Sequence, residues 1–192
     1  MIRYRTLAFL GVAGVAGVVA AERWLAALIA MGEGPDLVMK MAITIDAPID
    51  RVWDEIADIE RQPLWMHDMK RVRLTTEGPV RVGTRGEADV RIFMVGIVDA
   101  VEVDILEPPT RFGIRHVGTY SGDGRFTLEA IDARRTLVRW DERLAPPILP
   151  NLTQVLQKPI LGGVFQSDLE RLKEMVEAGW AEATGGAGAD AG

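Results

Sequence analysis

The feature of this sequence that most limits its possible folds is a series of strand-like segments joined by very short turns. These segments are residues 85–93, 96–106, 111–117, 124–132 and 134–145. They are rich in β-branched and aromatic residues, as strands usually are. Strands that follow one another through tight turns pair with their sequence neighbours, so we expect an antiparallel meander.

Further elements are expected on both sides of the meander. Strands are predicted over 38–45 and 71–76, and the stretch "APIDRVWDEIADIERQPLW" between them has the apolar spacing of one amphipathic helix and a second short helix. After the last strand, residues 150–180 are predicted to be helical, with a long apolar stripe at helical spacing over 161–176. Pro159 is expected to kink or restart this helix, and its polar residues, Asp168 among them, are expected to face water.

This order of elements resembles the START-like superfamily of SRPBCC proteins, in its polyketide cyclase/dehydrase branch. The resemblance extends over about residues 38–179 and implies an α+β helix-grip fold, in which a curved antiparallel sheet wraps around a long C-terminal helix. Trp53 and Trp65 would then fill the corner beside the two small helices. The residues that carry the resemblance are Ala47-Pro48, Val52-Trp53, Ile56, Asp58, Glu60, Pro63, Trp65-Met66, Gly78-Pro79, Gly83-Thr84, 107–111 and 168–173.

The N-terminal segment is apolar and precedes this domain. Arg3 and Arg5 come before an uncharged run, residues 6–21, which as a helix would span roughly 24 Å, somewhat less than the ~30 Å core of a bilayer. We expect a single-pass membrane anchor with a cytoplasmic N-terminus. Two alternatives are a secretory signal cleaved after residues 19–21, and a buried helix of a soluble domain.

These patterns divide the chain into four parts. They are an apolar N-terminal helix (1–31), a linker (32–37), the helix-grip domain (38–180) and a disordered tail (181–192).

Composition removes several classes of function. The net charge is −6 and the sequence has no basic stripe, which argues against a nucleic-acid partner. The chain has no cysteine, so disulfides and thiolate chemistry are excluded. The sequence also lacks a zinc-binding His/Glu pair, a nucleophile elbow and a phosphate-binding glycine loop. We therefore expect neither a metal nor a cofactor.

A sheet that grips one helix encloses a space, and inward side chains alternate along each strand. An apolar lining of this kind suits a hydrophobic small molecule in a pocket of ~300–1,000 Å³. The alternative is that the inward side chains meet and fill the interior. The predicted lining, with Leu172 on the same helical stripe, is Val90, Ile92, Val101, Val103, Ile105, Phe112, Ile114, His116, Phe126, Leu128, Val138, Trp140, Leu161, Phe165 and Leu169.

Polar residues in the inward phase are the candidates for chemistry. Asp99, His116 and Glu142 share this phase with apolar neighbours, and a buried carboxylate beside an imidazole can perform acid–base work. If the two carboxylates instead lie at strand ends, they are solvated, and His116 is then a rim residue. Tyr120 and Arg115 flank a turn that is expected to form part of the cavity mouth.

Three functions follow, in order of preference. The first is a membrane-associated, non-catalytic carrier for a lipid or polyketide-like molecule. The second, implied by the resemblance, is a cyclase, aromatase or dehydratase that uses the acid–base candidates in the same cavity. The third is a scaffold domain whose cavity has collapsed.

Overall fold

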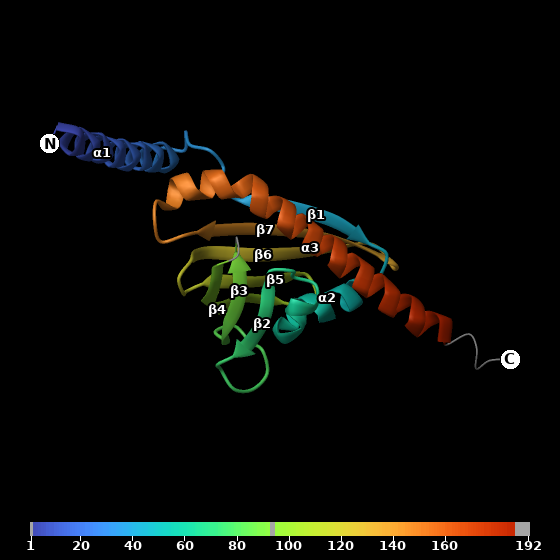
Figure 1. Cartoon of the computed structure of the whole chain (residues 1–192). Helices are drawn as coiled ribbons and strands as arrows, with labels where there is room; N and C mark the ends of the chain where they lie inside the picture. The colour runs from blue at the N-terminus through green and yellow to red at the C-terminus, as the bar shows by residue number, and fades with distance from the viewer. Residues whose placement is uncertain (1, 93–94, 187–192) are drawn as a thin grey trace.

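The structure is a computed structural model that describes residues 2–92 and 95–186, with the side chains of 14–91 and 95–183. It shows one sheet, one long C-terminal helix and a separate N-terminal helix (Figure 1). In chain order the elements are α1 (Ile2–Ala30), β1 (Met39–Ile45), α2 (Ile49–Ala57), the 3-10 helix η1 (Ile59–Leu64), β2 (Met69–Leu74), β3 (Arg85–Ile92), β4 (Val95–Glu107), β5 (Arg111–His116), β6 (Ser121–Asp132), β7 (Arg135–Ala145) and α3 (Pro150–Gly186).

The meander predicted from the tight turns is confirmed. The sheet has seven strands in the order β1-β7-β6-β5-β4-β3-β2, and every neighbouring pair is antiparallel. The last strand, β7, pairs with the first strand, β1. Therefore β1 lies at one edge of the sheet and β2 at the other. Helix α3 crosses one face of the sheet, and α2 lies at one end of it (Figure 1). This is the predicted α+β helix-grip architecture.

The corner beside the two small helices is filled by aromatic side chains, as the resemblance implied. Trp65 is fully buried and meets Phe126 and Trp140 edge-on, at ring-centroid distances of 6.1 and 6.2 Å. Trp53 meets Phe112 in the same manner at 6.5 Å. Edge-to-face pairs of this kind add about 0.5–1.5 kcal/mol beyond their buried area, so the cluster holds this end of the sheet against α2 and η1.

A β-bulge in β4 corrects one predicted orientation. The pairing of β4 with β5 shifts between Val103, opposite Ile114, and Ile105, opposite Gly113. An extra residue reverses the side-chain alternation beyond it. Ile105 therefore shares the outer face with Gly113, and Leu106 packs against the core in its place. The prediction that Ile105 points inward is wrong.

Helix α3 is longer and more continuous than predicted. It runs through Pro159 without a break and ends at Gly186, so the predicted restart at Pro159 does not occur, although Figure 1 shows the helix bending after its first turns. Residues 181–186, predicted as part of a disordered tail, are helical. The rest of that predicted tail lies outside the described residues.

Helix α1 joins the domain through the start of α3. The carboxylate of Glu22 accepts hydrogen bonds from the backbone N–H groups of Asn151 (3.0 Å) and Leu152 (2.9 Å), and from the amide nitrogen Nδ2 of Asn151 (2.8 Å). These N–H groups have no partner within the helix, because they belong to its first turn. Burial raises the pKa of Glu22, but the hydrogen bonds from residues 151 and 152 outweigh that effect and lower it overall.

The structure does not support the predicted transmembrane helix. Among the residues whose side chains are described, no helix combines the length and apolar character needed to cross a bilayer. The first half of the predicted anchor run, residues 6–13, lies outside those side chains.

Candidate functional site

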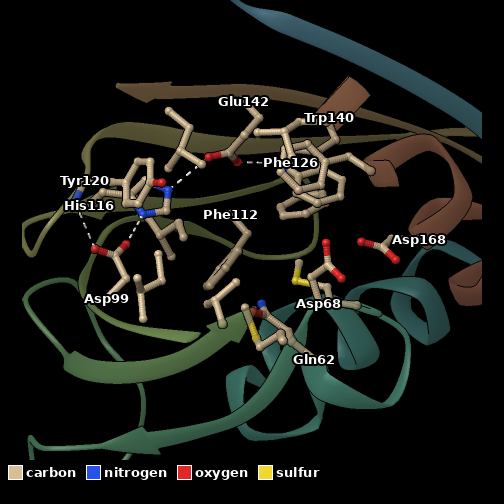
Figure 2. A pocket seen from close by; sticks show the side chains of 18 residues that line it. Gln62, Asp68, Asp99, Phe112, His116, Tyr120, Phe126, Trp140, Glu142 and Asp168 are labelled. Atoms are coloured by element: carbon tan, nitrogen blue, oxygen red, sulfur yellow. Dashed lines mark hydrogen bonds and ion pairs between the residues drawn. The ribbon is translucent and has the colours of Figure 1, made fainter. Parts of the chain in front are cut away.

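A cavity of about 90 Å³ lies between the sheet, α3 and the segment around η1 (Figure 2). This is smaller than the predicted size, since pockets for drug-sized ligands usually measure ~300–1,000 Å³, but it far exceeds the ~10–15 Å³ that one water needs. The space suits a single ring or a short chain, and a whole lipid would have to lie partly outside it. The lining residues are Gln62, Met66, Asp68, Met69, Val90, Ile97, Asp99, Phe112, Ile114, His116, Tyr120, Phe126, Trp140, Glu142, Leu144, Leu161, Phe165 and Asp168.

The predicted lining separates into two groups. Val90, Phe112, Ile114, His116, Phe126, Trp140, Leu161 and Phe165 line the cavity. Val103, Leu128, Val138, Leu169 and Leu172 instead belong to the packed core, and Val101 is buried but does not reach the cavity. The side chain of Ile92 lies outside the described residues. Strand alternation tells which face a side chain takes, but not where along the strand opposing side chains meet, so part of the interior is filled and part is hollow.

Several lining residues were not predicted. Ile97 and Leu144 share the inward phases of Asp99 and Glu142, so the sequence pattern could have identified both. Gln62 comes from η1, Met66 and Asp68 from the irregular segment after it, where no periodicity exists, and Met69 is the first residue of β2. Asp168 was expected to face water, yet it is only 2% exposed. That prediction is wrong, because the irregular segment of residues 65–68 contacts this face of α3, which the helical pattern marks as polar, through the His67 N–H.

Three of the five catalytic candidates form one buried cluster. His116 lies between two carboxylates, with its Nδ1 2.6 Å from Oδ2 of Asp99 and its Nε2 2.9 Å from Oε1 of Glu142 (Figure 2). Both carboxylates are buried, at 3% and 4% exposure. The alternative in which they are solvated at strand ends is therefore wrong. Trp140 donates from its indole Nε1 to the second oxygen of Glu142 at 2.9 Å.

The charge of this cluster follows from its contacts. Burial lowers the pKa of His116, but the hydrogen bonds and negative charges of Asp99 and Glu142 outweigh this effect and raise it to about 10. His116 is then an imidazolium at neutral pH and donates from both ring nitrogens. One positive charge between two carboxylates leaves this end of the cavity with a net negative charge.

Glycine makes room for the cluster on β6. Gly124 pairs with Glu142 across the strands, and a Cβ on it would lie 2.5 Å from the carboxylate oxygen Oε2. Contacts below about 3 Å are not tolerated without a shift, so a side chain here would displace the carboxylate that His116 and Trp140 hold. The second glycine in the sequence "SGDG" is thus required by close packing.

The remaining two candidates differ in position. Tyr120 lines the cavity, and its backbone N–H donates to Oδ1 of Asp99 at 3.3 Å. Burial, and then the negative charge of Asp99, raise the pKa of its phenol. Arg115 is exposed on the outer face, where its Nη2 lies 2.7 Å from Oε1 of Glu102. The prediction that Arg115 belongs to the site is wrong. Successive side chains of β5 point to opposite faces of the sheet, so Arg115 points away from the cavity that His116 lines.

A second polar group lies at the other side of the cavity. Asp68 and Asp168 both line it, and Oδ1 of Asp168 accepts a hydrogen bond from the backbone N–H of His67 at 2.9 Å. Burial raises the pKa of Asp168, and the nearby charge of Asp68 raises it further. The hydrogen bond from the His67 N–H lowers it, and the resulting pKa is about 6. His67 itself lies in an exposed turn. Within the described part of the chain, no three His, Asp or Glu side chains are grouped to hold a metal ion.

Comparison with known proteins agrees with this architecture. A family model described as "Polyketide cyclase / dehydrase and lipid transport" matches residues 37–177. The search of curated proteins gave no match.

Solved structures share the fold at low sequence identity. The Zhui aromatase/cyclase from a Streptomyces species has a TM-score of 0.61 at 17% identity, and the match covers 73% of this chain and 93% of that one. A protein from Thermus thermophilus gives 0.60 at 18% identity, over 74% and 98%. A START superfamily protein from Mycobacterium smegmatis gives 0.56 at 15% identity, over 76% and 98%. At such identities the likeness establishes the fold alone.

The His116 cluster predicts a specific dependence of stability on pH. Because the pKa of His116 lies above its ordinary value of 6.5, at about 10, protonation stabilises the fold. This stabilisation is complete below about pH 6.5 and is lost as the pH rises through 10. We expect the free energy of unfolding, measured by urea titration, to fall over this range in the native chain. The variant His116→Gln should be about 3–5 kcal/mol less stable near pH 7, since it leaves two buried carboxylates without a counter-charge.

The matched control is His67→Gln, which changes the chain's other histidine on the surface. It should keep the stability of the native chain and its decline toward high pH. Equal stability of His116→Gln and the native chain near neutral pH would contradict the charged cluster.

Proposed function

This chain belongs to the polyketide cyclase / dehydrase and lipid transport family, and on that premise we propose that it binds a small hydrophobic molecule in the cavity between its sheet and α3. The observation that carries the proposal is the cavity itself, kept open inside an otherwise packed core. Protein interiors seldom keep such voids. At about 24 cal/mol per Å³, a fully enclosed and dry void of this size would cost roughly 2 kcal/mol, which is an upper bound for this partly open cavity. A guest that fills it would recover that free energy.

The aromatic wall of the cavity suits a flat guest. Trp140 stacks on Phe126 with ring centroids 4.8 Å apart and ring planes inclined by 27°, and the ring centroid of Phe165 from α3 lies 4.9 Å from that of Trp140. Phe112 continues this wall beside Phe126. Rings arranged in this way offer faces and edges against which another ring can stack. The lining therefore favours a molecule that contains an aromatic or similarly flat apolar group.

The geometry of His116 supports binding over catalysis at that end of the cavity. Both of its ring nitrogens are held by carboxylates, so neither can exchange a proton with a guest unless a buried ion pair first breaks. Breaking such a pair leaves an uncompensated buried charge, at a cost of about 3–5 kcal/mol. His116 therefore neutralises and positions Asp99 and Glu142, and a carrier remains the first choice of function.

Filling the cavity provides the test. Ile97 lines it, whereas Val98, the next residue on β4, points outward and is 56% exposed. We expect toluene and benzyl alcohol to bind the native chain, as measured by chemical-shift titration. The variant Ile97→Trp should reduce their affinity by about tenfold or more, because the indole occupies their place.

The control Val98→Trp adds the same side chain on the opposite face and should bind like the native chain. If neither probe binds the native chain, the proposal of a receptive cavity is wrong.

A second candidate function is acid–base catalysis, and Asp168 favours it. This carboxyl group is buried against the cavity, and its pKa of about 6 places it close to neutral pH. General acids and bases work best when their pKa lies near the operating pH, and enzymes raise carboxyl groups to such values by burial. The enzymatic alternative, a cyclase or dehydratase on a carbonyl compound, would then rely on Asp168 and not on His116.

Proton abstraction next to a carbonyl group can be tested without the natural substrate. If the second candidate is correct, the native chain should accelerate the exchange of the α-protons of phenylacetone for deuterium, followed by NMR in heavy water. Asp168→Asn should lower this acceleration by about a hundredfold or more, while His116→Gln that remains folded should not. Exchange at the rate of buffer alone would reject Asp168 as a general base.

We also propose that α1 brings the domain to a membrane surface. Its described part exposes Val15, Val18, Val19 and Trp24, and a Cβ on Gly14 or Gly17 would meet nothing within 4 Å. Apolar side chains gathered on an exposed helix favour a lipid interface over water. Membrane localisation is thus retained as a proposal, at the membrane surface in place of the single-pass anchor expected from the sequence.

Vesicle flotation of the full chain tests this placement. We expect the native chain to float with phosphatidylcholine vesicles, and a variant that carries Val15→Asp, Val18→Asp and Val19→Asp to stay in the dense fraction, because charged groups resist transfer into the bilayer interface. The control Ile131→Asp changes an exposed apolar residue on β6 and should float like the native chain. Equal flotation of the triple variant would contradict membrane attachment through α1.

A further inference from the structure

The cavity has an unusual charge character. Among the described residues that line it, the ionisable groups other than Tyr120 are four carboxyl groups and one histidine, and there is no Lys or Arg. The histidine is already shared between Asp99 and Glu142. A guest therefore meets negative charge and hydrogen-bond acceptors, with no free cation to receive an anionic group.

The two carboxyl groups outside the His116 cluster lie together. Figure 2 shows Asp68 and Asp168 near one another, on the side of the cavity away from His116, with Phe112 between the two polar ends. Asp168 is 2% exposed, and its Oδ1 accepts the His67 N–H. No described residue donates a hydrogen bond to its Oδ2. Asp168 lines the cavity, and a carboxylate oxygen that borders an apolar cavity and has no donor of its own is a group that a ligand can satisfy.

The charges around Asp168 define its state before a ligand arrives. From the segment before β2, Asp68 repels its negative charge, while the backbone N–H and the ring of His67 favour it. From α3 itself, Arg171 favours it as well, and burial opposes it most strongly. The balance disfavours the carboxylate, so the free protein holds this carboxyl group close to its titration point near neutral pH.

We infer that the ligand of this cavity carries a protonated amine beside its ring, and that Asp168, with Asp68, binds the ammonium group while the aromatic wall receives the ring. This inference rests on the proposed function, because it names the chemical class of the guest. An ammonium group supplies the donors that Asp168 lacks and offsets the repulsion between the two carboxylates. It also lies favourably against aromatic faces such as those of Phe126 and Phe165. A carboxylate of the same size would add a like charge to a buried acidic site.

Three probes of nearly equal size test the effect of the ligand's charge on binding: benzylamine is a cation, benzyl alcohol is neutral and benzoate is an anion. Each is titrated into the full chain near neutral pH, and chemical shifts of the isotope-labelled protein report the dissociation constant. We expect benzylamine to bind about tenfold or more tightly than benzyl alcohol, the range typical of hydrogen bonds to a charged group. Benzoate should bind more weakly than both.

The variant Asp168→Asn should lower the affinity for benzylamine by about tenfold and leave benzyl alcohol unchanged. An asparagine oxygen can still accept the His67 N–H, so the local fold is kept. Glu170→Gln is the matched control, since it removes an acidic charge from an exposed position on the same helix; it should leave all three affinities unchanged.

The pH dependence of the native chain gives a measurement that needs no variant. An alkylammonium group stays charged below about pH 9, whereas Asp168 becomes protonated below its pKa of about 6. Affinity for benzylamine should therefore fall as the pH is lowered through about 6, while affinity for benzyl alcohol stays constant.

The outcomes are distinct. Benzyl alcohol or benzoate binding as tightly as benzylamine would overturn the inference and leave the cavity proposal intact. The inference is overturned in the same way if Asp168→Asn and a lower pH both leave benzylamine binding unchanged. If none of the three probes binds, and toluene does not bind either, the proposed function itself fails and the inference falls with it.

Discussion

Two carboxylates buried in an apolar interior need a positive charge, and in this protein His116 supplies it. The pairing of four strands brings these three side chains together. Asp99, His116 and Glu142 come from β4, β5 and β7, and β6 lies between the last two strands with Gly124 where a side chain would collide with Glu142. A register slip of one residue in any of these strands would turn one partner to the outer face. Separating the partners leaves an uncompensated buried charge, at a cost of about 3–5 kcal/mol, so the cluster disfavours any other strand register. The cluster thus specifies the strand register at the edge of the cavity.

The interior has a filled part, at the aromatic corner, and a hollow part, beside the His116 cluster. Near α2 and η1, Trp53, Trp65 and Phe112 fill the space between the sheet and the helices. Toward the His116 cluster the interior is hollow, and there the carboxylates of β4 and β7 are bonded to His116 on β5. The hollow is therefore bounded by an aromatic wall on one side and by fixed carboxylates on two others. Such a boundary gives both apolar burial and direction to a guest.

Much of the fold was predictable from the sequence, because regular elements carry periodic patterns. Tight turns identified the meander, and inward alternation placed Asp99, His116 and Glu142 on the same face of the sheet. The failures have local causes. The bulge after Val103 reversed the phase of Ile105, and no pattern in β4 announces it. Asp168 has the spacing of a solvent-facing helical residue, but the irregular segment of residues 65–68 contacts it through the His67 N–H. The volume of the cavity depends on how opposing side chains interlock, which a one-dimensional pattern does not contain.

Helix α3 takes its N-terminal cap from a distant part of the chain. Glu22 provides the acceptors for its first N–H groups, and a carboxylate there also meets the positive end of the helix dipole. Any cleavage or truncation that separates α1 from the rest would leave those donors to solvent, and the helix would fray from that end. Fraying would spread toward Leu161, the first residue that α3 contributes to the cavity. The part of α3 that borders the cavity therefore depends on its junction with α1, although no described residue of α1 lines the cavity.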